Sequence, residues 1–78
     1  MGYTFTFGDI MRICTTLGLA RVDKSMVWRG VGSDGKFRQT RIDSHGLGRP
    51  LATGTAHVIA KQLRFESLEE MYSYLQNL

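Results

Sequence analysis

Strand-forming residues around a glycine-rich turn decide the fold, and they occupy the stretch MVWRGVGSDGKFRQTRI, residues 26–42. Valine and tryptophan before the turn, and phenylalanine, threonine and isoleucine after it, favour β-strands. The segment between them, Gly32-Ser33-Asp34-Gly35, consists of turn residues with Asp34-Gly35 at its tip. An earlier run of strand-forming residues ends just before the turn residues at 23–25. The sequence therefore predicts three antiparallel strands, near Leu19–Val22, Met26–Val31 and Lys36–Ile42.

The same turn also reads GxGxxG, from Gly30 to Gly35. In a dinucleotide-binding fold this motif closes a strand, opens a helix and is followed about 20 residues later by an acidic residue. Here the motif is followed by a strand-like segment instead. The glycines are therefore interpreted as part of a hairpin and not as a nucleotide-binding loop.

Three amphipathic helices flank the predicted strands. The first begins at a capping pair, Thr6 and Asp9, and ends before Gly18. A second is entered through Thr53-Gly54-Thr55, and a third begins at the capping box formed by Ser67 and Glu70. Their apolar stripes comprise Ile10, Ile13, Cys14 and Leu17, then Ala56, Ile59, Ala60 and Leu63, then Leu68, Met71, Tyr72 and Leu75. We expect one α+β domain over residues 1–78, with the order helix, three-stranded antiparallel sheet, helix and short C-terminal helix.

Positive charge is concentrated in the middle of this chain of 78 residues, whose formal net charge is +3. Basic residues dominate from Arg21 to Arg49, whereas the tail after Arg64 carries three glutamates and no base. Such a distribution is typical of a surface that binds a phosphate backbone. With a single cysteine and no apolar run of about 18 residues, the chain is expected to be cytoplasmic and to have no contact with a membrane.

Two histidines are candidates for chemistry. Asp43, Ser44 and His45 include the residue types of a hydrolytic triad, but no nucleophile elbow or oxyanion-hole motif accompanies them. His57 falls on the exposed side of the second helix. A metal site built on these two histidines would need further ligands, so we expect no metal and no cofactor.

The aromatic side chains Trp28 and Phe37 lie on neighbouring predicted strands. They have two possible roles, stacking on unpaired bases or packing in the core, and the core is favoured for the single tryptophan of a small domain.

Several short motifs, taken in order, resemble the HicA family over nearly the whole chain. These are His45-Gly46, then Gly54-Thr55, then the run Ile59-Ala60-Lys61-Gln62, and finally Ser67-Leu68-Glu69-Glu70. The resemblance implies a fold similar to a double-stranded-RNA-binding domain, cleavage of messenger RNA as a toxin, and neutralisation by a HicB-like antitoxin.

The resemblance also implies a catalytic histidine in a Gly-Ser-His-like segment at the start of the second strand. In this chain Ser25 matches that segment, but Met26 stands where the histidine belongs. A thioether cannot exchange a proton near neutral pH, so the sequence predicts a divergent member whose cleavage is weak or lost.

The leading hypothesis is therefore a HicA-like RNA-binding domain. Several strand arginines are expected to share one solvent face, and the predicted phosphate contacts are Arg29, Lys36, Arg38, Arg41 and Arg49. One alternative is an active messenger-RNA interferase that uses His45 for proton transfer. The other is a protein-interaction domain with no nucleic-acid role, in which the basic strands meet an acidic partner.

Overall fold

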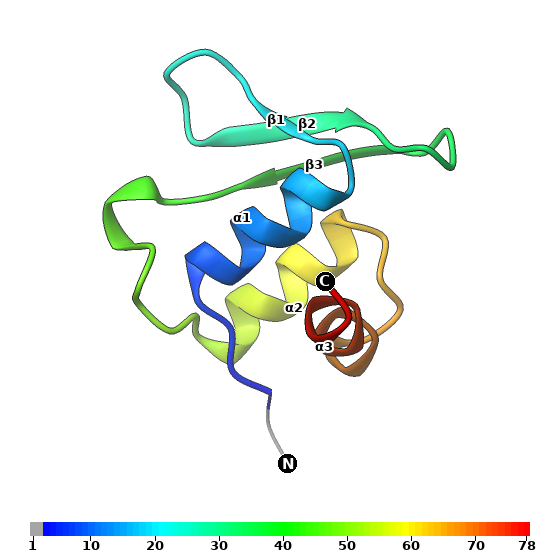
Figure 1. Ribbon diagram of the computed structural model, residues 1–78. Helices are drawn as coiled ribbons and strands as arrows, with labels where there is room; N and C mark the ends of the chain where they lie inside the picture. Colours follow the sequence, from blue (N-terminus) through cyan, green and yellow to red (C-terminus); the bar gives the residue numbers. More distant parts are fainter. Residues whose placement is uncertain (1–2) are drawn as a thin grey trace.

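A computed structural model describes residues 3–78 and shows a three-stranded sheet with helices on one side (Figure 1). The elements are, in order, α1 (Phe7–Thr16), β1 (Ala20–Arg21), β2 (Val27–Val31), β3 (Phe37–Arg41), a 3-10 turn η1 (Ser44–Gly46), α2 (Thr53–Gln62) and α3 (Leu68–Gln76). The predicted α+β class and the order of its helices and strands are confirmed. The strands are shorter than expected, and β1 has only two residues.

The sheet is an antiparallel meander with the order β1-β2-β3. Val31 pairs with Phe37 next to the turn, and Val27 pairs with Arg41 at the far end of the hairpin. The backbone N–H of Gly35 donates to Gly32 O at 2.9 Å, and Gly35 has a φ of 78°, a conformation that glycine adopts without strain. The GxGxxG segment is thus a hairpin, as the sequence predicted.

Helix α1 begins at the predicted capping box. The backbone N–H of Asp9 donates to Thr6 Oγ1 at 3.1 Å, and the Asp9 carboxylate accepts from the backbone N–H of Thr6 at 3.0 Å. The helix buries Ile10, Ile13 and Cys14 completely. Burial raises the pKa of the Cys14 thiol to about 12, which makes it an unreactive core residue at neutral pH.

Helices α2 and α3 complete the core below the sheet (Figure 1). Helix α2 contributes Ala56, Ile59 and Ala60, and α3 packs against both α1 and α2. The predicted capping box of α3 is half formed. Ser67 Oγ accepts from the backbone N–H of Glu70, but the Glu70 carboxylate accepts from the backbone N–H of Glu66.

The segment before α1 is extended and packs on the rest of the domain. Phe5 is buried, and its carbonyl accepts from the backbone N–H of Leu51 at 2.7 Å. The Tyr3 and Tyr72 ring centroids lie 4.9 Å apart, which joins this segment to α3. Within the described residues, no helix has the length and apolar character that crossing a bilayer requires.

Candidate nucleic-acid interface

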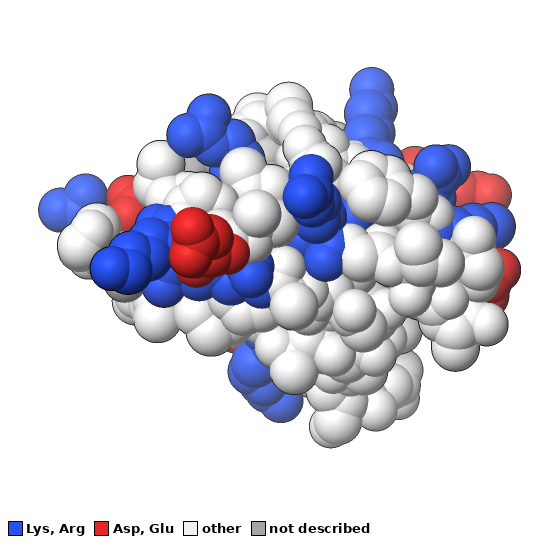
Figure 2. All heavy atoms as spheres, turned by 90° about the horizontal axis from the view of Figure 1, so that it is seen from above, with Lys and Arg blue, Asp and Glu red and all other residues white. Residues whose placement is uncertain are grey.

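The two faces of the sheet differ because the helices cover only one of them (Figure 1). Residues alternate between the faces along β3, where Arg38 and Thr40 are buried and Phe37, Gln39 and Arg41 are exposed. The register places Arg29 of β2 opposite Gln39, on the same outer face. Figure 2, which looks onto the sheet side of the molecule, shows basic side chains spread over this face with a few acidic ones among them.

Two of the predicted phosphate contacts, Arg29 and Arg41, lie together on this outer face. Arg29 faces Gln39, and Arg41 is two residues farther along β3, so the two arginines are diagonal neighbours. Phe37 lies on the same face with 49% of its surface exposed, next to Val31. Trp28 points to the opposite face and packs against the core. The outer sheet surface, defined by Arg29, Val31, Phe37 and Arg41, is therefore basic and partly apolar.

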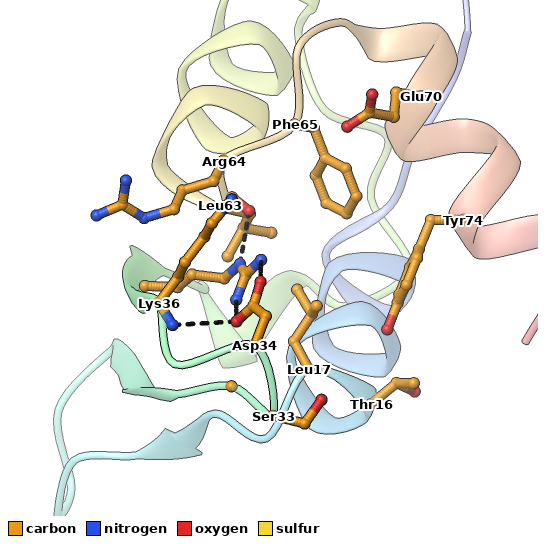
Figure 3. A pocket seen from close by; sticks show the side chains of 12 residues that line it. Thr16, Leu17, Ser33, Asp34, Lys36, Leu63, Arg64, Phe65, Glu70 and Tyr74 are labelled. Atoms are coloured by element: carbon orange, nitrogen blue, oxygen red, sulfur yellow. Dashed lines mark hydrogen bonds and ion pairs between the residues drawn. The ribbon is translucent and has the colours of Figure 1, made fainter.

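Arg38 does not share this surface, which corrects the expectation that it lies on the solvent face with the other strand arginines. Its side chain is 9% exposed and points to the helices. Nη1 and Nη2 donate to the two carboxylate oxygens of Asp34 at 3.0 and 2.8 Å, and Nε donates to Leu63 O at 2.9 Å (Figure 3). The pair raises the pKa of Arg38 and holds the pKa of Asp34 well below its ordinary value. Arg38 thus joins the hairpin to the end of α2.

Lys36 lines a polar cavity of about 380 Å³ built around the Asp34–Arg38 pair. Arg64 is a second cation at its rim, and sequence reasoning did not single it out (Figure 3). Arg64 has a φ of 67°, and its Nε donates to Phe37 O at 2.8 Å. The sequence signal that could have identified Arg64 is its position, because it is a basic residue directly after the predicted end of the second helix. Arg49 is distant in the chain from these groups and lies exposed in the loop after η1, close to Gly46.

Met26 lines a separate hollow of about 320 Å³ between the far end of the hairpin and α2. The hollow is bordered by Phe7, Met26, Arg41, Asp43, Thr55, Val58, Ile59 and Gln62. Met26 and Val58 are 39% and 54% exposed, so the rim is apolar. Neither of the described histidines borders the hollow, and Asp43 is its single carboxylate.

His45 lies on η1, in the segment that follows β3. The Asp43 carboxylate caps this turn by accepting from the backbone N–H of His45 at 3.0 Å, so it is not directed at the imidazole. Both His45 and His57 are exposed. The residue types of a hydrolytic triad are therefore consecutive here without forming a proton relay between Asp43 and His45.

Metal ligands are not clustered in the part of the chain that the structure describes: no group of three or more His, Cys, Asp or Glu side chains there could hold an ion. Comparison of the chain with models of protein families, with curated proteins and with solved structures found no match.

Proposed function

We propose that this protein is a HicA-like RNA-binding domain that binds single-stranded RNA on its outer sheet surface and whose cleavage activity is weak or lost. The observation that carries the proposal is the placement of Arg29, Arg41 and Phe37 on one uncovered sheet face. Two cations supply attraction for the phosphate backbone, and an exposed aromatic ring supplies a face on which a base stacks.

The position of Phe37 supports single-stranded over duplex RNA as the ligand. Bases in a duplex are stacked on each other and present no free ring face, whereas unpaired bases stack on aromatic side chains. Phe37 stands beside the exposed Val31 at the turn end of the hairpin, and Arg41 stands at the other end of β3. With a rise of about 3.4 Å per residue, the four steps between them span roughly 14 Å. That length corresponds to a few nucleotides of extended strand.

The chemistry of the hollow around Met26 supports the loss of cleavage. Cleavage through the 2′-hydroxyl needs a group that exchanges a proton near neutral pH, and a thioether has no such proton. The described residues bordering the hollow include one carboxylate, Asp43, which already caps η1. The HicA resemblance carries the expectation of a HicB-like partner, and the single cysteine carries that of a cytoplasmic location.

The test is a salt titration of RNA binding. Binding is measured by the fluorescence anisotropy of a labelled unstructured oligonucleotide. The parent is compared with Arg29→Glu/Arg41→Glu, and with the control Arg12→Glu/Lys61→Glu, which alters exposed cations on α1 and α2. Each pair changes the formal net charge by −4, from +3 to −1, so total charge is matched.

We expect the sheet variant to bind at least about tenfold more weakly than the control, with a salt slope shallower by roughly 1.4 because two phosphate contacts are lost. Phe37→Ala should weaken binding by about 1–3 kcal/mol with no change in slope. Equal losses in the two charge-reversal variants, or binding that does not respond to salt, contradict the proposal.

A further inference from the structure

The outer edge of β3 carries backbone groups that no described residue uses. Lys36 O accepts from Gly32 N–H, and Ile42 N–H donates to Met26 O, so both of these residues direct their backbone groups toward the β2 side. Because that direction alternates along an antiparallel strand, Phe37, Gln39 and Arg41 direct theirs away from β2. The hydrogen bond from Arg64 Nε to Phe37 O agrees with this assignment.

Five hydrogen-bonding groups remain on this edge: the N–H of Phe37, the N–H and C=O of Gln39, and the N–H and C=O of Arg41. Apart from the Ser44 side chain, which lies outside the described part of the chain, none of residues 3–78 is a hydrogen-bond partner of these groups, and all three residues are exposed. A row of such groups is a template for pairing with another extended chain. Adding a strand here would extend the sheet, as in recognition by β-strand addition.

Charge on the edge indicates which chain fits. Lys36, Arg41 and Arg64 carry positive charge at or beside β3, while the Asp34 carboxylate is already paired with Arg38. A second copy of this protein would bring like charges together, which disfavours pairing between two β3 edges. A strand bearing carboxylates meets the opposite charge at both ends of β3.

We propose that the free edge of β3 is a docking site for an extended, acidic strand of a partner protein. Gln39 and Arg41 form the backbone hydrogen bonds with the added strand. Two carboxylates spaced four residues apart in that strand, roughly 14 Å, meet Arg41 at one end and the Arg64 guanidinium at the other. This docking does not require RNA binding, because its backbone hydrogen bonds come from the strand edge, although the Arg41 side chain also belongs to the outer sheet surface.

The test uses the acetylated and amidated peptide TEVTVET, with glutamates four residues apart, and a control peptide in which lysine replaces both glutamates. Binding is monitored by nuclear magnetic resonance at millimolar concentrations of peptide. We expect the acidic peptide to bind and to slow amide hydrogen exchange at Gln39 and Arg41 at least about fivefold. Exchange at Arg38 and Thr40, which already face β2, should change little.

Gln39→Pro removes one edge donor, and proline is tolerated where an edge N–H faces solvent. We expect it to weaken peptide binding at least about tenfold, whereas Gln39→Thr, which keeps the N–H, should stay within about twofold of the parent. If Gln39→Pro does not fold, a peptide N-methylated on the amides that face β3 tests the same hydrogen bonds from the other side. Four outcomes overturn the proposal: no binding of the acidic peptide, equal binding of the lysine peptide, binding without protection of Gln39 and Arg41, or self-association through this edge in sedimentation.

Discussion

The Arg38 guanidinium on β3 donates two hydrogen bonds, of 3.0 and 2.8 Å, to the carboxylate of Asp34 in the hairpin turn. Its Nε donates to Leu63 O at the end of α2. One side chain therefore holds the turn, the strand and a helix end together. The Arg38 guanidinium packs closely against the turn: a Cβ added to Gly32 would lie 2.8 Å from Arg38 Nη1.

The first prediction compares two arginines of neighbouring strands that differ in the face they occupy. Arg38→Ala should lower the free energy of unfolding by about 2 kcal/mol, because charged hydrogen bonds are lost and the carbonyl of Leu63 loses its buried hydrogen-bond donor. Arg29→Ala, on the outer face, should change it by less than about 0.5 kcal/mol. Urea denaturation followed by circular dichroism measures both. Equal effects would show that Arg38 is not a structural residue.

The second prediction concerns pH. The hydrogen bonds from Arg38 and then from the backbone N–H of Lys36 lower the pKa of Asp34 below its ordinary value of 3.8. A carboxyl whose pKa is lower in the folded state contributes stability above its ordinary pKa, and that contribution is lost as pH falls toward the folded value.

Asp34→Asn should therefore be less stable than the parent at about pH 6, and the difference should shrink as pH falls from about 4 toward 2. Urea midpoints across this range measure it. A difference independent of pH would mean that the carboxylate charge has no part in the effect.

The third prediction uses two glycines with different surroundings. A Cβ on Gly30 would lie 2.8 Å from the backbone oxygen of Gly18, so Gly30→Ala forces β2 away from the segment after α1 and should cost about 2 kcal/mol of stability. Gly54, in α2, has nothing within 4 Å of such a Cβ. Gly54→Ala should stabilise by about 0.5 kcal/mol, because alanine favours helix. Thermal unfolding of the two variants should therefore shift in opposite directions.

The fourth prediction addresses cleavage. Met26→His places a group that titrates near neutral pH in the hollow beside Arg41, and we expect RNA cleavage to increase at least about a hundredfold over the parent. His45→Ala should leave any cleavage by the parent unchanged, because His45 does not border the hollow. Gel analysis of a labelled RNA measures both rates. A parent activity that disappears in His45→Ala would instead support the alternative of an active interferase.

Much of the fold was predictable from local signals. The Thr6 and Asp9 pair and the Asp34-Gly35 tip each act within a few residues, so their effects do not depend on distant contacts. The length of β1 was overestimated because strand length depends on a partner, and the paired residues of β1 are Ala20 and Arg21. The 3-10 turn around His45 was missed because the Asp43 cap looks in sequence like half of a catalytic pair.

The candidate site was less predictable, although one signal was present. Arg38 and Arg41 are three residues apart on a strand, so they must point to opposite faces. That spacing separates them without telling which face the helices cover. Arg64 was missed because its role depends on the end of α2 coming to rest beside Phe37, a contact between residues 27 positions apart.

The order of helices and strands, the hairpin and the helix starts can be predicted from the sequence alone, because they follow from hydrogen bonds and side-chain patterns over a few residues. Three features became visible in the folded protein: Arg38 is buried and joins the hairpin to α2 while Arg29 and Arg41 face outward, Met26 borders a hollow that His45 does not, and β3 lies at the edge of the sheet. These features depend on which surface of the sheet the helices cover and on which strand lies at its edge, and both are set by contacts between segments far apart in the chain.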